Sequence, residues 1–202
     1  MKLILIRHGE TSWNKQRRIQ GSRSNTQLNE TGYAQADRIA ASLKQQRIDA
    51  IYSSPLKRAV NTAQILATAC GLQVRTVPEL QEIDAGELDG LSEKEMGQGH
   101  LAFWNEWRKG DSSLHLPGGE SLEDLQKRVG WAVERILERH TDDTVAVVGH
   151  LFTNMVIICR ALGLGLHDIR RLRLAPASIS IVEFTTQGNR LLLFNDTCHL
   201  EG

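Results

Sequence analysis

Short apolar runs alternate with longer segments of helical periodicity along most of the chain. The runs 3–6, 48–52, 74–77 and 144–148 have the length of strands. The first and the last of them contain almost no polar residue, which is typical of strands that are covered on both faces of a parallel sheet. We therefore expect a central sheet that is mostly parallel.

The segments between these runs have the spacing of helices. We predict helices over 29–46, 55–70 and 153–162, and the first of them has Asn29 as its N-cap. Gly71 would end the second helix, since glycine is favoured just after a helix C-terminus. Strands that alternate with helices in this order predict a three-layer α/β/α sandwich.

Two other parts of the chain depart from this alternation. Near the end, runs at 179–184 and 191–194 flank a Gly-Asn pair and predict a hairpin. In the middle, Ser92 and Glu95 have the spacing of a capping box and predict the start of a helix. That helix would carry three aromatic residues, Phe103, Trp104 and Trp107. We expect 92–119 to form a short helical insertion over the active site, within one domain spanning 1–202.

Ser121 then predicts the start of a long amphipathic helix. Apolar residues recur at helical spacing from Leu122 to Leu137, and polar residues occupy the other positions. Such a helix packs one face on a core and leaves the other in solvent. We expect it to cover one face of the sheet.

Composition narrows the class of protein. The chain has 202 residues, 41% hydrophobic and 24% charged, with 24 basic and 24 acidic side chains. This zero net charge does not favour nucleic acid or an anionic membrane as a partner, and no apolar run is long enough to span a bilayer. Three cysteines without CxxC spacing argue against a disulfide framework or a structural zinc site, so we expect a cytoplasmic protein.

Four side chains with phosphate-binding chemistry follow predicted strands. His8 comes just after the run 3–6, with Arg7 before it, and His150 comes just after the run 144–148. Arg58 lies at the start of the helix that follows 48–52. Ligands bind where parallel strands end, so these residues would meet at one sheet edge. Two arginines beside two histidines suit a phosphate group, whose oxygens match the guanidinium fork.

Two other kinds of site compete with this interpretation. His8 and His150 with Glu82 or Asp84 could bind zinc, but the adjacent arginines would repel a divalent cation and no HExxH spacing occurs. A nucleotide-binding turn after Val148 lacks the glycines of GxGxxG, and no GxxxxGK[ST] sequence is present. We therefore expect no metal and no cofactor.

The sequence resembles the histidine phosphatase superfamily, which includes the phosphoglycerate mutases. The resemblance rests on motifs in the family's order: RHGET at 7–11 with Asn14, LNETG at 28–32, SSPLKRA at 53–59, ELQEIDAGELDG at 79–90, PGGES at 117–121 and GH at 149–150. It covers nearly the whole chain and implies the phosphoglycerate mutase-like fold.

The resemblance also implies a role for each site residue. His8 would be the nucleophile that forms a phosphohistidine, and Glu82 would protonate the leaving group, for which it must begin protonated. Arg7, Arg58 and His150 would hold the phosphate without a metal. Asn14 and Gln20 match positions that line the phosphate pocket. We also expect the first backbone amides of the helix after His150 to point at the phosphate.

The chain is similar to the small phosphatases of the family, among them α-ribazole phosphatases, metal-independent phosphoserine phosphatases and broad-specificity enzymes. Mutases are generally longer, and the sequence shows no further basic cluster suited to a second phosphate. Hydrolysis of a small phosphorylated substrate is therefore expected, with a cofactor-dependent phosphoglycerate mutase as the alternative. The sequence leaves the substrate open among phosphoserine, ribazole phosphate, sugar phosphates and phosphoglycerate.

The leaving-group side of the pocket is expected to differ from that of relatives. Leu151 stands where many members have glycine, and its side chain would reshape the pocket. Trp104 and Trp107 are neighbours on a helix and would form an aromatic wall there, or anchor the insertion. His199 could contact substrate, although purely local hydrogen bonds are favoured for it. An edge strand could pair in a homodimer.

Overall fold

A mixed six-stranded sheet forms the centre of the computed structural model, which describes residues 1–201. The strand order is β3-β2-β4-β1-β5-β6. The strands are β1 (Lys2–Arg7), β2 (Ala50–Ser53), β3 (Val74–Thr76), β4 (Thr144–Gly149), β5 (Ile179–Glu183) and β6 (Arg190–Asp196). The first four in chain order pair in parallel, and β5 and β6 add an antiparallel hairpin next to β1. The expected parallel core and terminal hairpin are confirmed.

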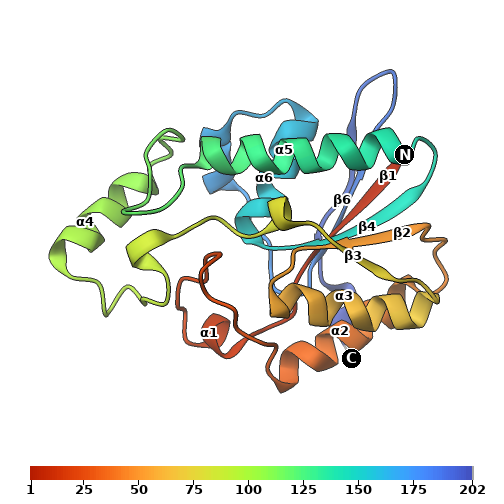
Figure 1. The fold of residues 1–202 in the computed structure, drawn as a ribbon, viewed down its shortest axis with the longest axis horizontal. Coiled ribbons are helices and arrows are strands. Elements are labelled where there is room, and N and C mark those ends of the chain that lie inside the picture. The colour runs from red at the N-terminus through yellow and green to blue at the C-terminus, as the bar shows by residue number, and fades with distance from the viewer. Residues whose placement is uncertain (202) are drawn as a thin grey trace.

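Helices cover both faces of this sheet (Figure 1). They are α2 (Glu30–Leu43) and α3 (Lys57–Cys70) on one face, and α5 (Leu122–Arg139) and α6 (Leu151–Leu162) on the other. Alternate residues of β1 belong to the two cores: Ile4 and Ile6 pack with α2 and α3, whereas Leu3 and Leu5 pack with α5 and α6. This two-sided burial explains the unbroken apolar run and confirms the three-layer sandwich.

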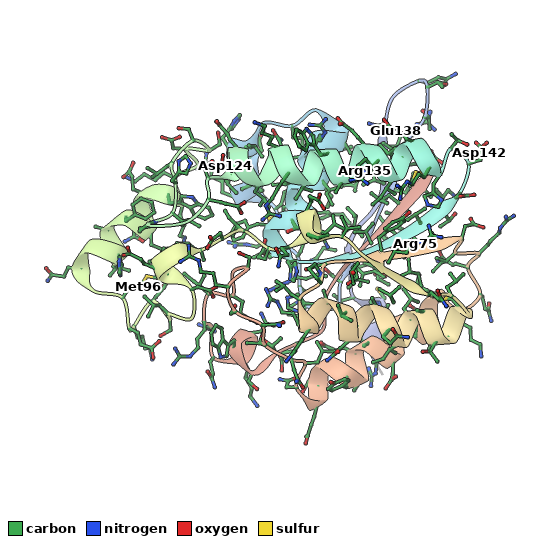
Figure 2. The ribbon with its side chains drawn as sticks, viewed as in Figure 1. Arg75, Met96, Asp124, Arg135, Glu138 and Asp142 are labelled. Carbon is green, nitrogen blue, oxygen red and sulfur yellow. The ribbon has the colours of Figure 1, made fainter. Side chains whose placement is uncertain are left out.

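α5 has the amphipathic character that its sequence predicts. Val129, Val133 and Ile136 are buried against the sheet. Arg135 and Glu138 are exposed and project from the outer side of the helix (Figure 2). The Ser121 side chain accepts a hydrogen bond from the Asp124 backbone N–H and caps the first turn, as expected.

The insertion extends beyond the end of the sheet and carries α4 (Gln98–Trp107) (Figure 1). α4 begins at Gln98, so the prediction of a helix opened by Ser92 is wrong. The hydrogen bonds between Ser92 and Glu95 do form, but they close only a turn. Ser92 is instead held by a β-bridge to Arg18, whose guanidinium binds both oxygens of Glu95.

Two other helix starts differ from the prediction. α3 begins at Lys57 and not at Pro55, because Leu56 is extended and serves as the N-cap. α6 begins at Leu151, directly after His150, and not at Thr153. The second shift places the helix N-terminus at the sheet edge where the candidate residues lie.

Several short helices connect these elements. They are α1 (Ser12–Lys15) and the 3-10 helices η1 (Pro78–Leu80), η2 (Gly86–Leu88), η3 (Leu166–Arg171) and η4 (Cys198–Leu200). Among residues 1–201, no helix has both the length and the apolar character needed to cross a membrane.

Candidate active site

The two histidines meet at the carboxyl ends of adjacent strands. β1 and β4 pair in parallel with Arg7 opposite Gly149, so the next residues, His8 and His150, lie side by side. Their ring centroids are 5.2 Å apart, and the ring planes are inclined at 61°. The structure therefore brings together the two imidazoles that the strand pattern placed at this edge.

Hydrogen bonding fixes which ring nitrogen of His8 keeps a free lone pair. Its Nδ1 lies 2.7 Å from the carbonyl oxygen of Gly9. Because a carbonyl only accepts hydrogen bonds, Nδ1 carries the proton and donates it. In the neutral ring Nε2 then has the free lone pair. Burial, together with the charges of Arg58 and then Arg7, holds the pKa of His8 well below the ordinary histidine value. His8 is therefore neutral near pH 7.

The turn after His8 requires glycine for steric reasons. A Cβ atom on Gly9 would lie 2.5 Å from the carbonyl oxygen of Gly32, at the start of α2. The Gly9 N–H donates to the Thr62 hydroxyl on α3. These contacts hold the carbonyl that orients the His8 ring.

His150 is held by a serine that the sequence reasoning did not single out. Its Nε2 is 2.7 Å from Oγ of Ser54, just after β2, and its buried Nδ1 has no partner within residues 1–201. Burial, followed by the charge of Arg58, holds the pKa of His150 well below its ordinary value. In the tautomer in which the Ser54 hydroxyl donates to Nε2, Nδ1 carries the proton and can donate it to a ligand. Ser54 lies within the SSPLKRA motif, so the family resemblance could have marked it as a site residue.

Two buried arginines supply positive charge beside these rings. Arg58 is fully buried and donates to the backbone oxygens of Gly21 and Ser24, while Arg7 donates to that of Leu174. The Nε atom of each arginine is buried and has no partner within residues 1–201. Burial lowers the pKa of each to about 10, so both are charged near pH 7.

Buried cations with unsatisfied donors call for an anion. Leaving a buried charged donor unpaired costs free energy. A phosphate group supplies both negative charge and acceptor oxygens for the free N–H groups of Arg7, Arg58 and His150. This arrangement is suited to binding a dianion.

Glu82 is held by the N-terminus of α6. Its Oε2 accepts the backbone N–H of Phe152 at 3.0 Å, and its Oε1 accepts the N–H groups of Ile83 and Thr153 at 2.9 and 3.2 Å. The Thr153 hydroxyl is also 3.3 Å from Oε1. The expectation that these first amides point at phosphate is therefore wrong for Phe152 and Thr153. α6 begins at Leu151, two residues earlier than predicted, so these two N–H groups belong to its first turn. They bind the carboxyl group of Glu82.

Arg128 on α5 fixes the loop that carries Glu82, and the sequence reasoning missed it. Its guanidinium donates to the backbone oxygens of Glu79, Gln81 and Glu82 at 2.8–2.9 Å. It also binds both carboxylate oxygens of Glu120. Glu120 lies within the PGGES motif, so the family resemblance could have pointed to it. The helical spacing of α5 marked Arg128 only as a polar position.

Asn14 and Gln20 both line the pocket, where the family resemblance placed them. The Gln20 Oε1 accepts hydrogen bonds from the hydroxyls of Thr11 and Thr26, and its buried Nε2 has no partner within residues 1–201. Asn14 Oδ1 accepts the Thr11 N–H. The free amide of Gln20 is a further donor for a bound anion.

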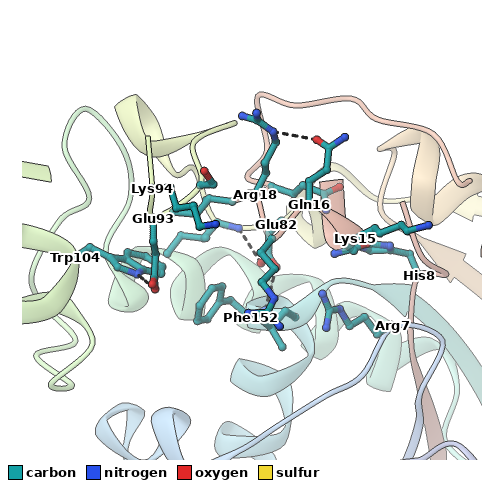
Figure 3. Close-up of a pocket in the computed structure, with 17 residues that line it drawn as sticks. Arg7, His8, Lys15, Gln16, Arg18, Glu82, Glu93, Lys94, Trp104 and Phe152 are labelled. Carbon is teal, nitrogen blue, oxygen red and sulfur yellow. Dashed lines mark hydrogen bonds between the residues drawn. The ribbon is translucent and has the colours of Figure 1, made fainter. Parts of the chain in front are cut away.

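The pocket continues outward from His8, Arg7 and Glu82 as a cavity of about 690 Å³ (Figure 3). Leu151, Phe152 and Trp104 are among its apolar lining residues, so Leu151 does reach the pocket. Trp104 stacks on Trp107 with ring centroids 5.3 Å apart, and Trp107 packs edge-on against Phe152. Trp107 is 4% exposed and does not line the cavity, so it anchors α4 behind the wall that Trp104 forms.

His199 lies elsewhere. Its Nε2 is 3.0 Å from the backbone oxygen of Ala177, and it is not among the residues that line the pocket. This is the local hydrogen bonding that the sequence favoured for it. The Ala177 N–H in turn donates to the His8 carbonyl oxygen, so His199 supports the chain beside the site.

Within residues 1–201, no three histidine, cysteine or acidic side chains cluster in a way that could hold a metal ion. His8 and His150 are instead flanked by Arg7 and Arg58, whose charges act on both rings. The donor set of the pocket therefore fits an anion better than a cation.

The chain is similar to known proteins over nearly its whole length. It is 35% identical over 200 residues to phosphoserine phosphatase 1 of Hydrogenobacter thermophilus, covering 99% of this chain and 94% of that one. Among solved structures, an Entamoeba histolytica phosphoserine phosphatase mutant with bound phosphoserine matches with a TM-score of 0.88 at 29% identity, covering 98% of each chain. A mycobacterial glucosyl-3-phosphoglycerate phosphatase matches with a TM-score of 0.87 at 28% identity, covering 97% of this chain and 99% of that one. Residues 3–197 match the family described as "Histidine phosphatase superfamily (branch 1)". The chain therefore belongs to the histidine phosphatase superfamily.

Proposed function

We propose that this protein is a metal-independent phosphomonoesterase that hydrolyses small phosphorylated metabolites through a phosphohistidine on His8. The observation that carries the proposal is the state of His8: a neutral ring whose Nδ1–H is engaged by Gly9. Its Nε2 lone pair lies beside two buried guanidinium groups with free N–H donors. A nucleophile and an oxyanion site are thus adjacent.

In the first step, Nε2 of His8 attacks the phosphorus atom and the bond to the ester oxygen breaks. The departing oxygen takes a proton from Glu82. Oε2 is the oxygen suited to hold that proton, since it accepts one backbone hydrogen bond whereas Oε1 accepts from two N–H groups. The products are the free alcohol, the phosphohistidine and an ionised Glu82.

In the second step, water attacks the phosphohistidine. Glu82, now a carboxylate, takes a proton from that water, and the N–P bond breaks to release inorganic phosphate and neutral His8. In both steps Arg7, Arg58 and His150 stabilise the charge on the phosphoryl oxygens. No metal is required, because the arginines supply the positive charge.

Similarity to named proteins supports hydrolysis. Phosphoserine, glucosyl-3-phosphoglycerate and α-ribazole phosphatases are among the similar proteins. The α-ribazole phosphatase is a Shigella flexneri structure that matches with a TM-score of 0.85 at 25% identity, covering 97% of this chain and 96% of that one. A Yersinia pestis protein named "Probable phosphoglycerate mutase" is also 35% identical over 215 residues, covering all of this chain and 95% of that one. The mutase alternative therefore belongs in the test.

The test is phosphate release by the purified protein from a panel of small phosphomonoesters, with and without excess chelator. We expect turnover that the chelator leaves unchanged and that His8→Ala abolishes, with a loss of about 10⁴-fold or more. Turnover restored only by a divalent cation would contradict the metal-independent mechanism. Interconversion of phosphoglycerates that depends on a bisphosphate primer, without phosphate release, would support the mutase instead.

A further inference from the structure

Three basic side chains on the outer part of the pocket have no acidic partner. Lys15, Arg17 and Lys94 line the cavity, and none makes an ion pair with residues 1–201. The sequence showed no further basic cluster suited to a second phosphate, and it did not predict that these three side chains share one cavity. The sequence separates these residues, and a bridge between Arg18 and Ser92 brings the end of α1 and the residues after it next to the insertion.

The other charged groups at this end of the pocket are already paired. Arg18 binds both carboxylate oxygens of Glu95, and Glu93 accepts hydrogen bonds from Arg108 and from the Trp104 indole. The three unpaired cations therefore leave the outer pocket with an excess of positive charge. In Figure 3, Lys94 and Lys15 lie on opposite sides of Glu82, so charge flanks the space that a leaving group would occupy.

The backbone of Arg17 provides an independent observation. Its φ is +55°, in the left-handed region that favours glycine. Its N–H donates to the Asn14 oxygen, and the Arg18 N–H donates to the Trp13 oxygen. This is the hydrogen-bond pattern in which a helix ends on a left-handed residue, usually glycine.

An arginine at such a position costs free energy that glycine would avoid. Non-glycine residues held in strained conformations cluster at sites where the side chain acts. The Arg17 side chain lines the pocket and has no partner that would offset the strain within residues 1–201. A bound anion would supply that partner.

We propose that Arg17, together with Lys15 and Lys94, binds a second anionic group on the leaving-group side of the substrate, either a carboxylate or a second phosphoryl group. This inference rests on the proposed phosphatase function, because the first phosphoryl group is held by the buried arginines and His8. The apolar lining from Leu151, Phe152 and Trp104 accommodates the carbon skeleton between the two charges. The substrate is then a phosphomonoester of an acid or of a second phosphate ester.

The test compares three substrates that share a three-carbon skeleton: 3-phosphoglycerate, glycerol 1,3-bisphosphate and glycerol 3-phosphate. The first two carry the second anionic group as a carboxylate or a phosphoryl group, and the third has a hydroxyl instead. We expect the wild-type kcat/KM to be higher for at least one of the first two. We expect Arg17→Gly to reduce that preference by roughly ten-fold, as for the loss of one charge-assisted hydrogen bond.

Arg17→Gly also separates binding from folding. Glycine suits the left-handed backbone, so the variant should melt at the wild-type temperature or above it while its preference falls. A structural role for Arg17 would lower the melting temperature instead. Lys94→Gln should reduce the preference by a smaller factor. Lys44→Gln removes a charge that is also exposed but lies outside the pocket, and it should leave the preference unchanged.

The identity of the second anionic group follows from which preference is lost. Loss of a preference for 3-phosphoglycerate identifies a carboxylate, and loss of one for the bisphosphate identifies a phosphoryl group. Equal kcat/KM values for the three substrates, or a preference that survives in both Arg17→Gly and Lys94→Gln, would overturn the inference. p-Nitrophenyl phosphate is assayed beside these three substrates as a fourth compound. If the enzyme turns over only this ester, the inference fails and the phosphatase function stands. If it hydrolyses none of the four compounds, the proposed function itself fails.

Discussion

The inner and outer halves of the pocket are built in different ways. In the inner half, His8, Arg58 and Glu82 are each no more than 4% exposed, and their hydrogen-bond partners are mainly backbone atoms. In the outer half, charged side chains such as Arg18 and Glu93 are held mainly by other exposed side chains. Backbone partners fix geometry more firmly than flexible surface ion pairs do.

The difference suggests a division of labour. In the proposed function, the inner half presents the same charges to any phosphoryl group, so we expect it to determine the chemistry. In the same proposal, the outer half would contact the rest of the substrate, so we expect it to determine which ester is accepted. Substitutions in the inner half should therefore reduce turnover of every substrate, and substitutions in the outer half should change the ranking of substrates.

Arg58→Met should have a larger effect than the substitutions that follow, and it tests the inner half most clearly. It removes a buried transition-state charge while keeping much of the side-chain volume, and we expect kcat/KM to fall by about 10²–10³-fold for every phosphomonoester. Steady-state kinetics on several substrates would measure this.

Arg47→Met, which alters an exposed arginine paired with Asp49, is the matched control and should have little effect. A thermal melt would show that the Arg58 variant is folded. A folded Arg58→Met enzyme with near-normal turnover would contradict the role of Arg58 in binding the phosphate.

Glu82→Gln should have an effect that depends on the leaving group. The amide is similar in size but provides no carboxylic acid proton, so turnover of alkyl phosphates should fall by about 10²-fold. An activated aryl phosphate needs little proton assistance and should be affected much less. Comparable losses of kcat/KM for both classes of substrate would remove Glu82 from the role of proton donor.

The buried histidines of the inner half should make stability depend on pH. His8 and His150 have pKa values well below the ordinary value in the folded protein, so the unfolded chain binds protons more readily. Their contribution is present above pH 6.5 and is lost as the pH falls below it. The free energy of unfolding should drop between pH 7.5 and 5.5, by at most about 1.4 kcal/mol for each of these two residues.

Urea unfolding at the two pH values measures this drop. His8→Asn replaces one titrating ring with a neutral side chain, so about half of the drop should disappear. An unchanged pH dependence in that variant would show that His8 is not held neutral by its surroundings.

Trp104→Ala should have the smallest effect and tests the outer half. It removes part of the apolar lining while Trp107 remains buried behind it. We expect changes of roughly three- to ten-fold in KM that differ between substrates, with little change in kcat for a small aryl phosphate. A uniform loss of kcat would mean that Trp104 supports the inner half and not the substrate wall.

The inner half was largely predictable from sequence because its position follows from strand order. Unbroken apolar runs predict buried parallel strands, and the ends of such strands converge at one edge. His8 and His150 needed only that rule to be placed together, and Arg58 followed from the helix after β2. The resemblance to the family then added Glu82, whose loop has no periodic pattern.

The outer half was not predictable in the same way. The Ser92–Glu95 pattern predicted a helix, but a bridge to distant Arg18 keeps that segment in a turn. The three basic side chains were missed because Lys94 lines the same cavity as Lys15 and Arg17 only through the path of the insertion. Tertiary contacts between remote segments, and not local preference, decide this half.

The most direct test of the central claim is to trap the covalent intermediate. The enzyme would be mixed with an activated aryl phosphate carrying labelled phosphorus, quenched within the first turnover and digested for peptide mapping. The account predicts label that is acid-labile, stable in alkali and attached to His8, with none on His150. Label on another residue, or burst kinetics without labelled His8, would contradict it.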